Sequence, residues 1–352
     1  MISKVEPKVA LFWEFLDDGR LKCLACERIC KIRLGSIGIC GNYANMDSKL
    51  INLGYGLLSA IESRPIEIKP FFHYWPGSTS LTFSNYGCNF YCPWCQNHHI
   101  SFRRPTSEDI YFPPERLIKL AITNGDEGIC ASFTEPSTQV DYLIDVFSLA
   151  SKQGLYSTIV TNCYFTERAL SALMEAGANG FSVDIKGCPK AHKSILKGVN
   201  PVVPLRNAKI ILNNGGHVET VFLMVPGFND SAECIEWIIK EHLDVLGEDI
   251  PLHINRYHPA HRYIKPPTSL SKLLEAKKKA EEMGVKFVYI GNTGIWEFES
   301  TKCPKCSKML IVRQNARVSY YGLSDNKCPR CDEKIPIRGK YINKFAGWER
   351  FL

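Results

Sequence analysis

The sequence predicts an α/β fold in which a parallel sheet curves into a partial (β/α) barrel. Between about residues 79 and 291, short apolar runs alternate with amphipathic stretches, which is typical of successive βα units. No G-x-G-x-x-G follows an early apolar run, so a doubly wound nucleotide-binding sheet is disfavoured. Charged and polar residues follow several of the runs, where barrel enzymes carry their functional groups.

The spacing of apolar residues predicts the individual elements of this region. Apolar residues alternating with polar ones indicate a strand, and apolar residues three or four apart indicate a helix. Strands are expected at 79–86, 128–133, 156–161, 179–185, 217–225, 251–257 and 286–290. Helices are expected at 113–124, 137–152, 165–176, 204–213, 231–245 and 270–283. Six or seven such units suit an open or nearly closed barrel.

The length of 352 residues exceeds that of a usual single domain, so we expect one large domain with appendages. We expect an N-terminal cysteine-rich module with short strands at 1–77 and the barrel at 78–297. A zinc ribbon and a C-terminal tail, whose aromatic residues from Tyr341 to Leu352 could pack on the barrel, are expected at 298–352.

Three cysteines follow the first strand of the predicted barrel, after Gly87 interrupts the alternating pattern. Cys88, Cys92 and Cys95 have the spacing C-x3-C-x2-C, and no fourth cysteine lies close by in the sequence. A cubane iron–sulfur cluster takes four thiolates, so three would leave one iron open to a small molecule. A zinc knuckle with a distant fourth ligand and three buried structural thiols are the alternatives.

Two further sets of four cysteines lie near the ends of the chain. The first comprises Cys23, Cys26, Cys30 and Cys40, and the second Cys303, Cys306, Cys328 and Cys331. The second set, two C-x2-C pairs flanking a strand-like segment, predicts a structural zinc ribbon. The spacing of the first set does not choose between zinc and an auxiliary iron–sulfur cluster, although its compact loop slightly favours zinc.

The three-cysteine run, with Trp94 before its last cysteine, resembles the C-x3-C-x-aromatic-C signature of radical S-adenosylmethionine (radical SAM) enzymes. Segments 21–30, 38–41, 69–77 and 85–97 resemble more closely the radical SAM protein of the AmmeMemoRadiSam system, a group similar to pyruvate formate-lyase activating enzymes. The resemblance covers nearly the whole chain. It implies the partial barrel fold and a 4Fe-4S cluster, held by the three cysteines, whose fourth iron binds SAM.

The resemblance also implies SAM contacts at several strand ends. Ser132–Pro136 resembles the family's GGE element, with Phe133 and Thr134 in place of the glycines, and Glu135 would bind the amino group of SAM. The other implied contacts are Trp94, Asn162, Asp184, Lys186, His258 and Asn292. Glu135 could instead be a helix N-terminal acid, Asp184 and Lys186 a buried ion pair, and His258 a core residue.

The activity that the resemblance implies is an oxidoreductase reaction. An external one-electron reductant would drive cleavage of SAM to a 5′-deoxyadenosyl radical, which would take a hydrogen atom from a substrate. A protein substrate, as for an activating enzyme, is expected. Modification of RNA or of a small metabolite, and a non-catalytic iron–sulfur or zinc adaptor, are the alternatives.

Composition limits the location and the partners. The 15 cysteines cluster at metal-ligand spacing rather than as a disulfide framework, so we expect a reducing cytoplasm. No stretch approaches 18 uninterrupted apolar residues, and residues 1–7 contain no signal-peptide core, so no membrane association is expected. The net charge is +7, but the run Lys277–Lys279 reads as a solvated helix face, so nucleic acid is a less favoured partner that stays open.

Overall fold

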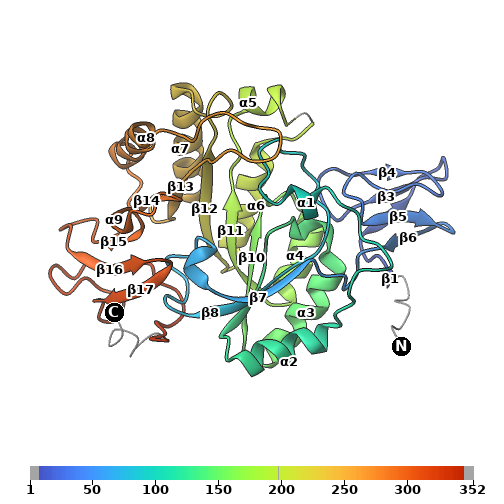
Figure 1. Cartoon of the computed structure of the whole chain (residues 1–352), viewed down its shortest axis with the longest axis horizontal. Coiled ribbons are helices and arrows are strands. Elements are labelled where there is room, and N and C mark those ends of the chain that lie inside the picture. Colours follow the sequence, from blue (N-terminus) through green and yellow to red (C-terminus); the bar gives the residue numbers. More distant parts are fainter. Residues whose placement is uncertain (1–7, 197, 345–352) are drawn as a thin grey trace.

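An eight-stranded sheet forms the centre of the computed structural model, which describes residues 8–196 and 198–344 (Figure 1). The strand order is β14-β13-β12-β11-β10-β9-β8-β7. Neighbouring strands from β8 to β14 are parallel, whereas β7 is antiparallel to β8. The strands are β7 (Ala60–Pro65), β8 (Thr79–Ser84), β9 (Gly128–Ala131), β10 (Tyr156–Thr161), β11 (Ala178–Asp184), β12 (His217–Met224), β13 (Leu252–Arg256) and β14 (Val288–Gly291). Because β7 and β14 are not paired with each other, the barrel is partial.

Helices connect the parallel strands and pack on them. They are α2 (Pro114–Asn124), α3 (Val140–Lys152), α4 (Glu167–Glu175), α6 (Val202–Asn213), α7 (Ala232–Leu246) and α8 (Leu270–Met283). Their starting points follow from local sequence, since Thr166, Ser231 and Ser269 cap α4, α7 and α8 with side-chain oxygens. Their apolar faces are buried against the sheet; α2, for example, buries Leu117 and Ala121 over β8 and β9.

The sequence located every parallel strand and every crossover helix listed above to within a few residues. It missed β7 and the short elements η1 (Ile66–Ile68), α1 (His98–Ser101), η2 (Pro136–Thr138), α5 (Pro189–Ser194) and α9 (Trp296–Glu299). Strand β7 lies at the edge of the sheet and is half-buried along its length. It therefore lacks the continuous apolar run that identifies the central strands.

Two small antiparallel sheets precede the barrel. One has the order β2 (Trp13–Phe15), β3 (Leu21–Cys23), β4 (Lys31–Ile32), and the other β1 (Lys8–Val9), β6 (Lys49–Asn52), β5 (Tyr43–Met46). Asp141, a fully buried carboxylate of α3, ties them to the barrel. It accepts hydrogen bonds from Leu11 N (2.7 Å), the Tyr43 hydroxyl (3.0 Å) and Asn52 Nδ2 (2.9 Å).

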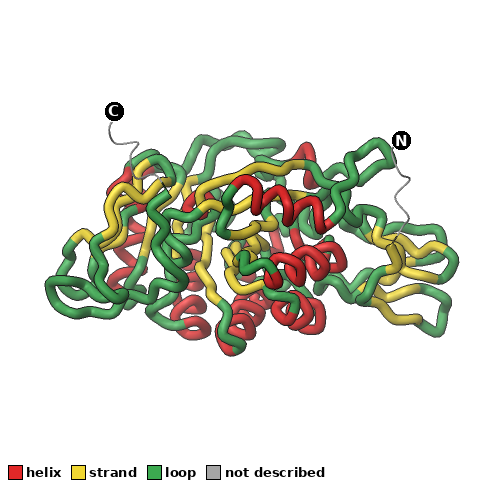
Figure 2. The backbone as a smooth tube through the Cα atoms, turned by 90° about the horizontal axis from the view of Figure 1, so that it is seen from below, coloured by secondary structure: helices red, strands yellow, loops and turns green. Residues whose placement is uncertain are grey.

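A third antiparallel sheet, of β15 (Thr301–Lys302), β16 (Met309–Gln314) and β17 (Arg317–Tyr321), carries the last cysteine set. We call residues 301–332 the ribbon. It lies at the opposite end of the molecule from β1–β6 (Figures 1 and 2). Arg313 is fully buried and donates to Phe72 O (2.5 Å), Glu299 O (3.1 Å) and Thr301 Oγ1 (2.8 Å), so it fixes the ribbon to the barrel.

The beginning of the C-terminal tail packs back on the molecule, with its aromatic residue Tyr341 on the ribbon where the sequence suggested the barrel. The ring of Tyr341 stacks on that of Tyr321, with centroids 4.3 Å apart, and Ile342 N donates to Pro76 O (2.9 Å). Residues 345–352 of the predicted tail and the N-terminal residues 1–7 lie outside the described residues. No helix among the described residues is long and apolar enough to cross a membrane.

Candidate functional site

The three-cysteine loop, residues 88–95, connects the buried strand β8 to α1. Gly87 precedes it with a φ of 86°, and a Cβ atom there would collide with the carbonyl oxygen of Cys40. Glycine is therefore required where the loop begins. Phe90 N donates to Cys88 Sγ (3.4 Å). Burial raises the pKa of the Cys92 thiol to about 11, although Lys186 acts against it, so the Cys92 thiol loses its proton when it binds metal.

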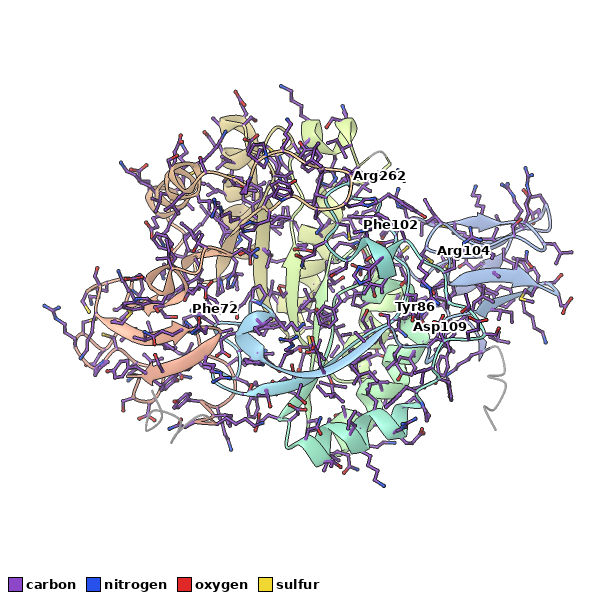
Figure 3. All side chains as sticks on the ribbon, in the orientation of Figure 1. Phe72, Tyr86, Phe102, Arg104, Asp109 and Arg262 are labelled. Atoms are coloured by element: carbon purple, nitrogen blue, oxygen red, sulfur yellow. The ribbon has the colours of Figure 1, made fainter. Side chains whose placement is uncertain are left out.

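Aromatic packing holds the far side of this loop. Trp94 is buried, and its ring lies 4.4 Å from that of Phe228 and 5.7 Å from that of Tyr263. Arg262 N donates to Pro93 O (2.9 Å), and Figure 3 shows Arg262 above Phe102, which follows α1. The segment after β13 thus covers the loop. This is packing of the loop, and the expected contact of Trp94 with SAM stays a prediction.

Glu135 lies after β9 and is nearly inaccessible, with 3% of its surface exposed. Its Oε1 accepts from Ser137 N (3.0 Å) and Thr161 Oγ1 (2.6 Å), and its Oε2 from Asn162 N (2.8 Å). Burial raises the pKa of the Glu135 carboxyl, while these donors lower it. The carboxylate therefore caps η2, as the alternative interpretation expects, and it also raises the pKa of the nearby Cys88 thiol.

Asn162 connects Glu135 to the three-cysteine loop. Its Nδ2 donates to Asn89 Oδ1 (2.7 Å), and Asn89 Nδ2 donates to Ser137 Oγ (3.0 Å). Asn89 is fully buried between two of the cysteines. The sequence reasoning overlooked Asn89 as an organising residue; its position inside the cysteine motif was the available signal.

Two non-glycine residues at strand ends, Phe133 and Cys163, adopt left-handed backbone conformations. Phe133 has a φ of 66° and Cys163 a φ of 54°. Each costs about 1–2 kcal/mol relative to a right-handed conformation, a cost that glycine avoids. Asn97 Nδ2 offsets part of it by donating to Phe133 O (2.7 Å). A left-handed backbone conformation thus follows both β9 and β10 without a glycine.

Asp184 and Lys186 leave the end of β11 beside the loop. Lys186 Nζ lies 2.6 Å from Asp184 Oδ2, and both side chains are partly exposed. Burial alone would lower the pKa of Lys186, but Asp184 and the Cys92 thiol raise it above its usual value. An ion pair is therefore present, partly exposed rather than buried as the alternative interpretation had it, and its charges act on Cys92.

His258 and Asn292 are exposed and lie together after β13 and β14. His258 Nε2 is 3.1 Å from Asn292 O, and Asn292 Nδ2 donates to Arg256 O (3.2 Å). Asn292 has a φ of 63°. His258 is therefore not a core residue. Neither residue has a described hydrogen bond to the three-cysteine loop.

A cavity opens beside Asn292, between β13, β14, the segment after β7 and the ribbon. It has about 1130 Å³ of space between its atoms and at its mouth. Glu67, Asn255 and Gln314 contribute polar side chains to its wall. Glu67 is 4% exposed, and its Oε2 has no hydrogen-bond partner among the described residues. Burial raises the pKa of Glu67 to about 7.

The cysteines of the ribbon converge, as the sequence predicts. Their four sulfur atoms all lie within 4.8 Å of one another, with Cys303 Sγ 3.5 Å from Cys331 Sγ and Cys306 Sγ 3.6 Å from Cys328 Sγ. Sulfurs that share one metal ion at about 2.3 Å can be no more than about 4.6 Å apart. The ribbon therefore fits a single metal ion.

The cysteines of the three-cysteine loop are arranged differently. Among the described residues, the ribbon is the one group of three or more possible ligands that come so close together. The sulfurs of Cys88, Cys92 and Cys95 are thus too widely spaced to share one ion. Ligands of a cubane cluster bind different irons, so this wider arrangement fits a cluster.

Comparison with known proteins agrees with this chemistry. Residues 83–242 match the family described as the radical SAM superfamily. An uncharacterized protein of Methanocaldococcus jannaschii is 36% identical over 93% of this chain and 98% of its own length. The chain belongs to the radical SAM superfamily.

Within that superfamily the chain is similar to pyruvate formate-lyase-activating enzyme of Streptococcus mutans, with 28% identity over 58% of this chain and 84% of that protein. Among solved structures, SuiB of Streptococcus suis bound to S-adenosylmethionine covers 62% of this chain with 50% of its own, at 14% identity and a TM-score of 0.46.

Proposed function

We propose that this protein is a radical SAM oxidoreductase that removes a hydrogen atom from a protein substrate. Cys88, Cys92 and Cys95 would hold a 4Fe-4S cluster. The observation that carries the proposal is a loop of three widely spaced thiols, set among polar side chains at the strand ends of the barrel. When bound, the cluster supplies the electron that splits SAM into methionine and a 5′-deoxyadenosyl radical, and an external one-electron reductant replaces that electron.

The residues around the loop have separate tasks in this proposal. Glu135 would accept a hydrogen bond from the SAM ammonium with the lone pair that Ser137, Thr161 and Asn162 leave unused. Asp184 and Lys186 would hold the ribose hydroxyls and the carboxylate of SAM. Their charges suit those partners, and they lie beside Cys92.

His258 and Asn292 would contact the adenosyl group. Their exposure and their mutual hydrogen bond support a position at the barrel mouth, where Asn292 also lines the cavity. Trp94 would shield the cluster from water. The cavity beside Asn292 would receive the substrate close to where the radical forms, and Glu67 offers a hydrogen-bond acceptor there for an amide or amine donor.

The similarity to a pyruvate formate-lyase-activating enzyme supports a protein substrate. We also propose that the chain is the radical SAM protein of the AmmeMemoRadiSam system, on the cysteine spacing and on segments 69–77 and 85–97. Modification of RNA or of a small metabolite is the second candidate, because the cavity could hold an extruded base or a small molecule. A non-catalytic adaptor is disfavoured by the polar groups gathered around the open loop.

For the ribbon we propose zinc. Sulfur separations of 3.5 and 3.6 Å suit four thiolates around one ion, and four protein ligands leave no position for substrate. The 15 cysteines are all free thiols, which supports a reducing compartment such as the cytoplasm.

The substrate class can be tested by hydrogen transfer. An extract of deuterated cells is separated into protein, RNA and small-molecule fractions. Each fraction is incubated anaerobically with reduced enzyme and unlabelled SAM. We expect deuterium in 5′-deoxyadenosine with the protein fraction only. A Cys92→Ala variant is the control and should give none. Deuterium from the RNA or metabolite fraction would contradict a protein substrate while keeping the radical chemistry.

A further inference from the structure

The N-terminal cysteine set, Cys23, Cys26, Cys30 and Cys40, surrounds a cavity that the catalytic proposal does not use. We propose that this set binds a second iron–sulfur cluster of the 4Fe-4S type, rather than zinc. The cavity lies between the β3–β4 hairpin and the turn before β5. Besides the cysteines, its wall includes Ala25, Ile32, Ile39 and Tyr43.

The spacing of the sulfur atoms distinguishes the two metals. In the ribbon, the sulfur atoms of the four cysteines lie close enough together to bind a single ion. The N-terminal cysteines face a common cavity but are not among the described groups in which three ligand atoms come within 4.8 Å. Four ligands that bind four different irons must stand further apart than four ligands of one ion. Among the described residues, neither the N-terminal set nor the three-cysteine loop has its sulfurs gathered closely enough for a single ion.

Backbone donors already point at these sulfurs. The N–H groups of Ala25, Arg28 and Asn42 hydrogen-bond to Cys23, Cys26 and Cys40, respectively, each from two residues further along the chain. Phe90 N has the same relation to Cys88 in the three-cysteine loop. Hydrogen bonds to cysteine sulfurs stabilise thiolates and tune the potential of a cluster. The backbone of the N-terminal set is therefore arranged for metal-bound thiolates.

The cavity is next to the candidate SAM site. Ser137 and Thr138 of η2, the helix that Glu135 caps, form part of its wall. Asn89, inside the three-cysteine loop, hydrogen-bonds to Cys26 and to Ser137. One buried side chain therefore connects both cysteine sets.

Further contacts fix the two cysteine sets against each other. Arg28 Nε donates to Asn89 O (2.8 Å), and Tyr91 hydroxyl donates to Ile39 O (2.7 Å). The Cys40 carbonyl lies where Gly87 lacks a side chain. These contacts run between the three-cysteine loop and the residues on both sides of the N-terminal cavity.

With four thiolates, every iron of the N-terminal cluster would have a protein ligand, so it would bind no SAM. Its position suits transfer of single electrons. A low-potential one-electron donor would reduce it by one electron, and that electron would pass to the cluster of the three-cysteine loop. The N-terminal cluster is then oxidised by one electron, and no bond or proton changes place at the cysteines.

The inference can be separated from the catalytic proposal with a triple variant, Cys88→Ala, Cys92→Ala and Cys95→Ala. After anaerobic reconstitution it should keep about four irons and about four sulfides per chain. Its dithionite-reduced electron paramagnetic resonance signal should not change when SAM is added. Absence of iron from the folded variant would overturn the inference and leave the catalytic proposal intact.

Metal analysis of the wild-type protein gives an independent result that does not depend on the variant. We expect about eight irons and one zinc per chain, against about four irons and two zincs if the N-terminal set binds zinc. Cys26→Ser should lose about four irons and keep the SAM-responsive signal. Cys130→Ala, at a buried thiol in β9 outside all three sets, is the matched control and should lose none. Four irons and two zincs in the wild type would overturn the inference.

Discussion

The three-cysteine loop and the ribbon use the same ligand type for different purposes, and the difference lies in their surroundings. The ribbon brings four sulfurs within 4.8 Å on its own small sheet, and Arg313 anchors that sheet in the barrel. The loop offers three wider-spaced sulfurs at the end of β8, where Glu135, Asn162 and the Asp184–Lys186 pair converge. A complete ligand set stabilises a fold, whereas an incomplete one among polar groups leaves a place for a reactant.

The largest stability effect should come from the anchor of the ribbon. Arg313→Met removes the donors to Phe72 O and Thr301 Oγ1, both buried acceptors, while keeping most of the side-chain volume. Because unpaired buried acceptors are costly, we expect the free energy of unfolding to fall by about 3 kcal/mol. Urea denaturation of metal-loaded protein measures it. Arg330→Met, at an exposed position of the ribbon, should change it by less than about 0.5 kcal/mol.

The same variant, Arg313→Met, tests whether the ribbon only stabilises the fold or also takes part in SAM cleavage. Folded, cluster-loaded Arg313→Met protein should cleave SAM at the wild-type rate, since no expected SAM contact lies in the ribbon. A rate that falls with unchanged cluster content would show that the ribbon takes part in SAM cleavage, and the contrast between the two regions would then be wrong.

A smaller effect is expected for SAM binding at the loop. Glu135→Gln and Asp184→Asn should keep the absorbance of the cluster but weaken SAM binding by about 1.5–3 kcal/mol, or about 10- to 150-fold, because each loses a charge-assisted hydrogen bond. Equilibrium dialysis on the reconstituted variants measures the affinity. Loss of iron with normal SAM affinity in the remaining loaded protein would mean that these residues serve the loop rather than the cofactor.

The smallest effect concerns pH. His73 is fully buried, with Nε2 2.7 Å from the Tyr289 hydroxyl, and burial lowers its pKa to about 3. Below the ordinary histidine pKa of about 6.5, His73 binds a proton in the unfolded chain but not in the folded one. The free energy of unfolding therefore decreases as the pH is lowered below about 6.5. We expect His73 to contribute about 1 kcal/mol of that loss between pH 6.5 and 5.5, since the unfolded imidazole is only half protonated at pH 6.5.

Urea denaturation of wild type and His73→Gln at the two pH values isolates this contribution. In His73→Gln, the free energy of unfolding should change correspondingly less between the two pH values than in wild type. His99→Gln, at an exposed histidine of α1, should keep the wild-type pH dependence. An unchanged dependence in His73→Gln would mean that His73 is not held neutral where barrel and ribbon meet.

Strong periodicity made most of the barrel predictable. Strands such as β11 and β12 are buried along nearly their whole length, so their apolar runs are long and clear. Edge strand β7 carries no such run and was missed. Cysteine spacing predicted the convergence of the ribbon cysteines, whereas the metal sites at the other two cysteine sets stay predictions.

Tertiary contacts explain what the sequence could not provide. The role of Glu135 as a cap depends on Thr161 and Asn162, which reach it from the next strand. The link through Asn89 depends on residues 73 and 48 positions away in the sequence. The separation of the N-terminal sulfurs likewise follows from the packing of two small sheets on the barrel. None of these distances is encoded in the local spacing that a sequence displays.

The most direct test of the central claim is the formation of 5′-deoxyadenosine by reconstituted, dithionite-reduced protein. With SAM, the wild type should release 5′-deoxyadenosine and methionine in equal amounts. Cys92→Ala should release none, since two thiolates cannot hold an intact cubane, and Cys306→Ala should remain active wherever it stays folded. Absence of 5′-deoxyadenosine from fully iron-loaded wild type, or undiminished formation by Cys92→Ala, would contradict the account.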